Sequence, residues 1–228
     1  MIKAGIDQDA IVKMFTDATA KQGETLRKAV SEATLKALQG RELTMENVRK
    51  VLRTVTQAAS AGAEKNAMPG VDVEALLEKA FAGMDAALLK AVEAQRKALE
   101  QFVSQGMAVQ DKPMKTALAN IEKMEDMFFT TVGKAAKDAG GALQAPWQHV
   151  LDSMKTQGTG TGMQAITSVE QLMAQAQSAL REGRNSGMRQ AQAMLDSYAA
   201  LVSGVLIGMS QGLQAAPVAK KPAKAAAK

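Results

Sequence analysis

The sequence predicts an all-α protein: an elongated bundle of about six amphipathic helices with coiled-coil-like stripes and a disordered basic C-terminal tail. Two observations predict this class. Alanine, the best helix former, and 15 methionines supply much of the 46% apolar content, whereas aromatic residues make up only 3%. Apolar residues also recur at steps of three and four, the period of one helix face. Because alanine buries little area, we expect long helices that touch along narrow stripes.

The first predicted helix begins after the N-cap residue Asp7 and ends before Gly40. Gly23 is its weak point, because glycine costs about 1 kcal/mol relative to alanine in a helix interior. A second helix begins near Thr44 and ends before the loop Asn66–Gly70, which contains proline and glycine.

Asp72 is the predicted N-cap of the most regular helix, which extends to about residue 109. At its full length this helix would span roughly 55 Å. That length exceeds the diameter of a small domain, so the sequence predicts an elongated molecule. A fourth helix restarts at Asp111–Pro113 and ends at Gly140 and Gly141, and Pro146 opens a short helix to about Lys155.

The stretch Thr156–Gly162, TQGTGTG, has the composition of a flexible linker. Its three glycines superficially resemble a phosphate-binding loop, but the GxxxxGK[ST] pattern is absent and no strand precedes them. We therefore place a boundary here, between an N-terminal helical region, 1–157, and a C-terminal helical hairpin, 158–214. Residues 215–228 form the tail.

The predicted hairpin consists of two helices joined by a turn at Arg181–Gly187. Its first helix carries an apolar stripe with alternating steps of three and four, typical of a seam that faces a partner helix. The stripe comprises Ile166, Val169, Met173, Ala176 and Leu180. The returning helix repeats this spacing at Ala191, Met194, Tyr198, Leu201, Val205 and Gly208.

The residues that usually perform catalysis form no recognisable constellation. Cysteine is absent, and the single histidine, His149, is expected to be a packing or surface residue. Glu122, Glu125 and Asp126 form the densest acidic cluster on a helix, and we expect them to lie on a solvated face. The sequence thus predicts a protein that is not an enzyme, with no catalytic residue, cofactor or metal site.

A candidate contact surface lies in the uncharged stretch of 23 residues from Ser197 to Ala219. Its middle is apolar nearly all round, which predicts either the central helix of the bundle or a surface that docks on another protomer or a hydrophobic surface. Gly204, Gly208 and Gly212 share one helix face and permit close helix approach. The predicted contact residues are Leu201, Val202, Gly204, Val205, Leu206, Ile207, Gly208 and Met209.

The tail supplies nearly all of the net charge of +5. Without its four lysines the chain has 24 basic and 23 acidic residues, so the body is almost neutral. Four lysines can neutralise only a few phosphates, which predicts at most weak, salt-sensitive contact with nucleic acid or another anionic surface. The predicted anionic-surface contacts are Lys220, Lys221, Lys224 and Lys228.

The N-terminal residues Asp7 and Asp9 stand where a signal peptide would be apolar, and no stretch is apolar enough to span a membrane. We therefore expect a cytoplasmic protein, with association to granules as a further expectation.

The chain resembles phasins, the small bacterial proteins that coat polyhydroxyalkanoate storage granules. The resemblance rests on the cysteine-free, Ala-, Gln- and Met-rich helical texture, the tail AKKPAKAAAK, and the stretch Ala86–Gly106, which is similar to a central phasin helix. An Asn-rich segment often found early in phasins is missing, and residues 8–38 are charged and Thr-rich instead. An uncharacterised family of bacterial helical proteins is the other interpretation.

The resemblance implies a non-enzymatic structural or surface-coating protein that binds hydrophobic granules or other protomers through amphipathic helices. The alternatives are a nucleoid- or DNA-associated protein that acts through the lysine tail, and an oligomeric scaffold. Salt-dependent DNA binding that disappears on deletion of residues 215–228 would favour the DNA-associated alternative.

Overall fold

The structure is a computed structural model that describes residues 12–13, 23–39, 43–65, 71–104, 112–181 and 202–209. All secondary structure in these residues is helical, which confirms the predicted all-α class. The helices are α2 (Gly23–Gln39), α3 (Met45–Lys65), α4 (Val73–Ser104), α5 (Lys112–Glu122), α6 (Met124–Ala139), the 3₁₀ turn η1 (Gly141–Leu143), α7 (Gln144–Gln157), α8 (Gly160–Arg181) and a short helix, 202–209. No helix among these described residues is long and apolar enough to cross a membrane.

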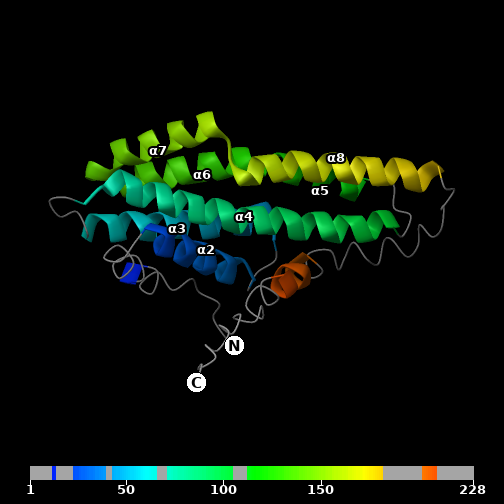
Figure 1. The fold of residues 1–228 in the computed structure, drawn as a ribbon, viewed down its shortest axis with the longest axis horizontal. Coiled ribbons are helices and arrows are strands. Elements are labelled where there is room, and N and C mark those ends of the chain that lie inside the picture. Colours follow the sequence, from blue (N-terminus) through cyan, green and yellow to red (C-terminus); the bar gives the residue numbers. More distant parts are fainter. Residues whose placement is uncertain are drawn as a thin grey trace, which may run out of the picture.

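Helix α4 lies at the centre of the arrangement and packs against α2, α3, α5, α7 and α8 (Figure 1). It begins as predicted, because the Asp72 carboxylate accepts a hydrogen bond of 3.0 Å from the backbone N–H of Ala75. It is described as far as Ser104, and its predicted extension to residue 109 lies outside the described residues. The central position therefore belongs to α4 and not to the uncharged helix before the tail.

Helices α2 and α4 approach closely at Gly83. A Cβ atom at this position would lie 2.6 Å from the carbonyl oxygen of Arg27 and 2.8 Å from the Cβ of Val30. Any larger residue would therefore push α2 away from α4, so glycine sets the spacing of this pair.

The helix predicted from Asp111 to Gly140 contains one irregularity, at Lys123, which separates α5 from α6. Backbone hydrogen bonds from Lys123 to Ala119 and from Met127 to Lys123 continue across it, so the two helices form one nearly continuous rod. The rod ends as predicted at Gly140, whose φ of 67° lies in the left-handed region that favours glycine.

Trp147 fixes α7 to α3. Its side chain is fully buried, and its indole Nε1 donates a hydrogen bond of 2.9 Å to the Ser60 hydroxyl. Ser60 in turn donates to the carbonyl oxygen of Thr56, 2.9 Å away. The buried polar groups at this contact are thus satisfied, as a stable interior requires.

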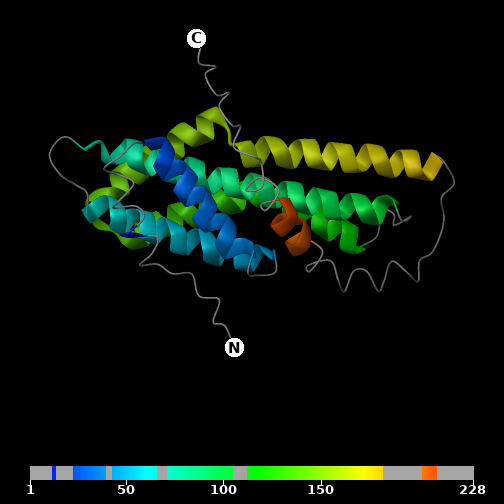
Figure 2. The same ribbon diagram turned by 60° about the horizontal axis from the view of Figure 1, so that its bottom comes forward.

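Helix α8 runs parallel to the C-terminal part of α4, in the right-hand part of the view (Figure 2). Asp85 contacts Gly160 near the start of α8, and Glu100 contacts Gln175 fifteen residues further along both helices. Figures 1 and 2 show the short helix 202–209 on the other side of α4 from α8. The connecting residues 182–201 lie outside the described residues, so the hairpin and the domain boundaries remain predictions.

Candidate functional site

The first turn of α8 is held by the side chain of Asp85 on α4. The Asp85 carboxylate accepts hydrogen bonds of 2.8 Å from the backbone N–H of Gly160 and 3.0 Å from that of Thr161. The Thr161 hydroxyl donates to the backbone carbonyl oxygen of Asp85 at 3.1 Å. A carboxylate at a helix N-terminus satisfies free N–H groups and complements the helix dipole.

A second carboxylate, that of Glu125 on α6, holds the residue before α8. The Thr159 hydroxyl donates to Glu125 Oε1 and accepts a hydrogen bond of 2.9 Å from the backbone N–H of Gly162. A side chain at Gly162 would collide with the Glu125 carboxylate. A larger residue at this position would therefore force the Glu125 carboxylate to move away from Thr159.

These contacts correct the prediction of a flexible linker at Thr156–Gly162. The segment completes α7, makes a turn and begins α8, and Thr159, Thr161 and Gly162 are buried. The glycines and threonines of TGTG serve a tight, capped connection, since glycine permits the turn and threonine is a favoured N-cap residue. The glycines and threonines of this segment were the only signal in the sequence for the connection. They did not identify Asp85 and Glu125 as the residues that accept hydrogen bonds from it.

The inner face of α8 consists of small residues. Its buried positions are Thr161, Gly162, Ala165, Ser168, Leu172 and Ala176. The predicted seam is thus wrong in register: of its members whose burial is described only Ala176 is buried, whereas Ile166 and Met173 are exposed. Small side chains allow α8 to lie close to α4, and Leu172 is buried among them, whereas Met163, Ile166 and Met173 are turned outward.

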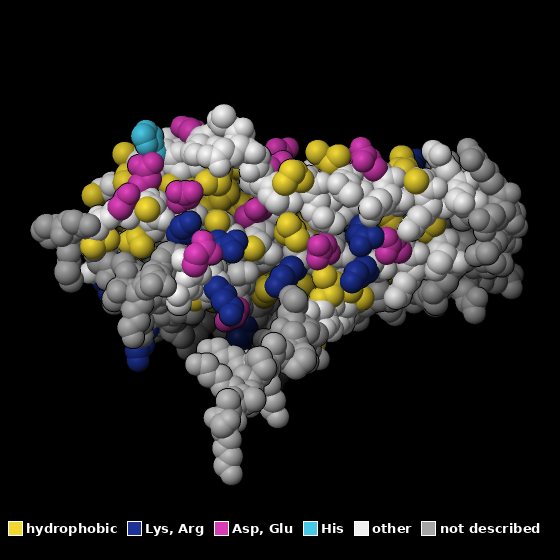
Figure 3. Space-filling view, in the orientation of Figure 1, with side chains coloured by type: hydrophobic (Ala, Val, Ile, Leu, Met, Phe, Trp, Pro, Cys, Tyr) yellow, Lys and Arg dark blue, Asp and Glu magenta, His cyan; other side chains and the backbone are white. Residues whose placement is uncertain are grey.

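The outward residues form the main apolar feature of the described surface, which we call the α8 stripe: Met163, Ile166 and Met173. Their exposed fractions are 69%, 63% and 46%, and Val169 beside them is half-buried. Figure 3 shows hydrophobic side chains along the right-hand part of the upper edge, where α8 runs, with acidic side chains between them. Glu170 is exposed on α8, four residues after Ile166. An apolar row of this kind on an otherwise polar surface typically marks an interaction site.

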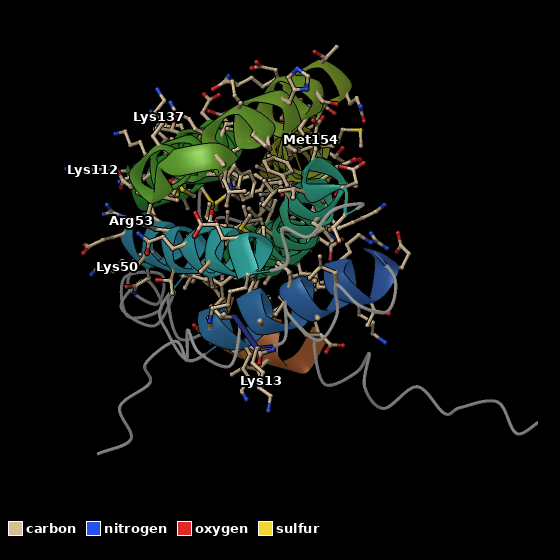
Figure 4. All side chains as sticks on the ribbon, turned by 90° about the vertical axis from the view of Figure 1, so that its left-hand side faces the viewer. Lys13, Lys50, Arg53, Lys112, Lys137 and Met154 are labelled. Carbon is tan, nitrogen blue, oxygen red and sulfur yellow. The ribbon has the colours of Figure 1, made fainter. Side chains whose placement is uncertain are left out.

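The other side of the molecule is charged. Lys50, Arg53, Lys112 and Lys137, from α3, α5 and α6, point outward in Figure 4. Arg53 forms an ion pair of 2.6 Å with Asp138, which links α3 to α6. Exposed ion pairs of this kind contribute only a few tenths of a kcal/mol to the stability of the fold. The charged side chains on this surface therefore favour solubility more than they stabilise the packing of the helices.

The predicted contact residues near the C-terminal end divide into two groups. Val202 and Leu206 are buried in the shared core, so their side chains face inward and not toward an external surface. Gly204 and Gly208 are exposed, and a Cβ atom on either would meet no atom within 4 Å.

Val205, Ile207 and Met209 are partly exposed on the same short helix. Their role in binding stays a prediction. Leu201 and the tail residues Lys220, Lys221, Lys224 and Lys228 lie outside the described residues.

The remaining candidates are surface groups. His149 is 77% exposed, and its Nδ1 lies 3.3 Å from the carboxylate oxygens of Glu74. Glu122 and Asp126 are exposed as predicted, whereas Glu125 is turned toward Thr159. Within the described ranges no three acidic or histidine side chains are placed to hold a metal ion.

Comparison with known families shows the family to which the chain belongs. Residues 1–215 match the model of a family of unknown function, DUF6781. The chain belongs to this family. No curated protein and no solved structure matches it. Membership agrees with the interpretation as an uncharacterised helical family, and the resemblance to phasins stays a hypothesis about function.

Proposed function

We propose that the protein is a non-enzymatic structural protein that coats a hydrophobic surface, such as a storage granule, and contacts that surface or neighbouring protomers through apolar helix faces. The observation that carries this proposal is the α8 stripe. Three large apolar side chains are exposed along α8, although the inner face of the same helix buries Leu172 and Ala176.

The chemistry of the stripe fits an adaptable contact. Methionine side chains are flexible and polarizable, so they fit surfaces of irregular shape without precise complementarity. Burial of exposed apolar area against an apolar partner contributes roughly 25 cal/mol per Å² before the cost of association is subtracted. A narrow row of Met and Ile therefore supports attachment without demanding a specific pocket.

The short helix 202–209 supplies a second apolar contact. Val205, Ile207 and Met209 are only partly covered, while Val202 and Leu206 fix the helix to the core. This helix and α8 lie on different sides of α4 (Figure 2). One protomer can thus present one face to the coated surface and another face to its neighbours.

Partitioning tests the proposal. Purified full-length protein is mixed with polyhydroxyalkanoate granules, and the fraction that sediments with the granules is compared with the fraction bound to hydrophilic beads. We expect enrichment on the granules, and a lower granule-bound fraction for the double variant Ile166→Gln and Met173→Gln. Val71→Gln is the matched control, because Val71 is an exposed apolar residue outside α8. A protein that stays in the supernatant as a stable monomer would contradict the proposal.

A further inference from the structure

Helix α8 is held in the bundle by little apolar burial. Among its side chains whose burial is described, Leu172 is the one large apolar residue that is fully buried, and the other buried positions are Gly, Ala, Ser and Thr. Helix α3 is one residue shorter and buries Val48, Val51, Leu52 and Val55. Because the hydrophobic effect grows with the apolar area removed from water, α8 gains less from docking than α3. Elements with few buried apolar contacts are the ones that open most easily.

The side of α4 that meets α8 carries charged groups. Asp85 and Glu100 contact α8 at Gly160 and Gln175, each 75 residues further along the chain. Arg96 shares this side of α4 with Glu100, four residues later, and pairs with its carboxylate. Three charged side chains thus border the contact. Contacts between parts of a protein that move relative to one another are more polar than a core, and the α4–α8 contact has this character.

Two polar atoms are buried in this contact without a partner. The Ser168 hydroxyl on the inner side of α8 and the Nε of Arg96 on α4 have no hydrogen-bond partner in the part of the chain that the structure describes. The offset of 75 residues places Ser168 opposite Glu93, three residues before Arg96. Water would bond to both atoms if α8 moved away, so docking loses hydrogen bonds that detachment restores.

The bundle uses only part of the apolar side of α8. The buried residues Ala165 and Leu172 are followed directly by the exposed residues Ile166 and Met173, and half-buried Val169 lies between the two sets. All five residues share one broad side of the helix, at steps of three and four. Away from α4 this side would be continuous, and a helix of this kind lies flat on a hydrophobic surface. The exposed stripe is therefore the half of an amphipathic helix that docking on α4 leaves uncovered.

We infer that α8 is a hinged element: it leaves α4 as a unit, and the detached helix is the form that contacts the coated surface. This inference rests on the proposed function, and it names the element that makes the contact. The hinge lies at Gly158, which is exposed and has a φ of 78° in the left-handed region. At the other end of α8, the 20 residues 182–201 precede the helix 202–209. That length of chain lets α8 move while Val202 and Leu206 stay in the core.

The docked position is held at the N-terminal end of α8. The hydrogen bonds that Asp85 accepts from Gly160 and Thr161, and the one between Thr159 and Glu125, break when α8 leaves. Water replaces each lost partner, because these groups then become exposed. A hydrophobic surface shifts the equilibrium toward the detached helix, since it covers the whole apolar side of that form but only the stripe of the docked form.

Amide hydrogen exchange of the full chain, without granules, tests whether α8 opens as a unit. A helix without tertiary packing is only marginally stable in water, so the amides of α8 exchange whenever it detaches. We expect uniform protection from Gly162 to Ala176, about tenfold below that of the buried part of α3. Protection equal to that of α3 would overturn the inference, and so would a steady decrease toward Arg181, which indicates fraying of the helix end.

The unpaired hydroxyl offers a variant that should close α8 more firmly. Ser168→Ala removes the buried hydroxyl with little change in volume, so exchange throughout α8 should slow about tenfold. Ser178→Ala is the matched control, because Ser178 is exposed on the same helix and the gain in helix propensity is the same. Equal effects of the two substitutions would show that the polar contact with α4 does not weaken docking, and would overturn the inference.

A covalent lock connects the opening to granule binding, because the chain contains no cysteine of its own. Glu100→Cys and Gln175→Cys replace two side chains in contact across α4 and α8, and a short bismaleimide joins them. We expect the locked protein to lose most of its granule-bound fraction relative to the same variant capped with N-ethylmaleimide. Arg53→Cys and Asp138→Cys, joined in the same way, fix α3 to α6 and should leave granule binding unchanged.

The two proposals fail in different ways. The lock leaves the α8 stripe exposed, so a locked protein that binds granules as well as the capped one overturns the hinged element and leaves the coating function in place. A parent chain that does not sediment with granules, although its α8 exchanges as a unit, contradicts the coating function and retains the opening of α8.

Discussion

Gly83 shows how one residue sets the distance between two helices. Its missing Cβ leaves room for the Arg27 carbonyl and the Val30 side chain of α2. Gly83→Ala should lower the free energy of unfolding by about 1 to 3 kcal/mol, because the close contact includes backbone, which cannot rotate away. Urea unfolding measures this difference.

Gly133 provides the matched control, since it also lies within a helix. A Cβ atom there would lie 3.6 Å from a Leu151 methyl group, an ordinary contact distance. Gly133→Ala should raise the free energy of unfolding by about 0.4 to 1 kcal/mol, because alanine is the better helix former. Equal effects of the two substitutions would contradict the close approach at Gly83.

Glu46 gives a pH-dependent effect at the surface. The hydrogen bond and the charge of Lys50, 2.7 Å away, hold the pKa of the Glu46 carboxyl below its ordinary value of 4.5. The native state therefore binds fewer protons than the unfolded state as pH falls through this range. The resulting stabilisation is present above pH 4.5 and is lost as pH falls through the native-state pKa.

Glu46→Gln removes this contribution. Thermal unfolding should show a slightly lower Tm for the variant than for the parent chain near neutral pH, and no difference once the carboxyl is protonated in both states. A difference that persists unchanged in acid would mean that the charge of Glu46 is not its cause.

At the scale of elements, α8 depends on a carboxylate from another helix. Asp85→Ala leaves the N–H groups of Gly160 and Thr161 without their acceptor, which should lower the free energy of unfolding by roughly 1 to 2 kcal/mol. Amide hydrogen exchange in the first turn of α8 should accelerate, and exchange in α3 should change less.

Asp152→Ala is the control for Asp85→Ala. The Asp152 carboxylate is exposed on α7, where it accepts a hydrogen bond of 3.0 Å from the Gln148 side chain of the same helix. Its removal should change the free energy of unfolding by less than about 0.5 kcal/mol. If both variants behaved alike, the capping of α8 by Asp85 would be refuted.

Local signals in the sequence identified most helix ends, because these signals act within a few residues. The Thr44 hydroxyl accepts a hydrogen bond of 3.2 Å from the backbone N–H of Asn47 at the start of α3. Asp72 and Gly140 also mark helix ends, as predicted. The inner face of α8 was missed for a physical reason. Hydrophobic size pointed to Ile166 and Met173, but close packing on α4 selects small residues such as Ala165.

The contacts that position α8 could not be predicted, because they join residues far apart in the chain. Asp85 and Gly160 are 75 residues apart, and Glu125 and Thr159 are 34 apart. A helix pattern states which residues share a face, but it does not state which other helix that face meets. Thr159 and the glycines around it carried the only local hint, as N-cap and turn residues.

At the scale of the whole molecule, the long central helix decides the shape. The 32 residues of α4 extend over about 48 Å, and the other described helices pack along it. The sequence predicted an elongated molecule from this helix, and Figure 1 shows helices arranged along one long axis. Helix α8 lies at the edge of this arrangement, so its outer residues Met163, Ile166 and Met173 are exposed while its inner side packs on α4, α5 and α6.

The distribution of methionines over the molecule predicts its response to oxidation. Met163 and Met173 are exposed on α8, whereas Met84 and Met124 are fully buried. Among the methionines that the structure describes, dilute peroxide should therefore oxidise Met163 and Met173 before Met84 and Met124, as peptide mass spectrometry would show. Because a sulfoxide is polar, the treated protein should keep its fold but show a lower granule-bound fraction. Replacement of both exposed methionines by leucine should preserve granule binding after peroxide treatment, since leucine is apolar and not oxidised. Oxidation of the buried residues at the same rate would contradict this arrangement of the core and the α8 stripe.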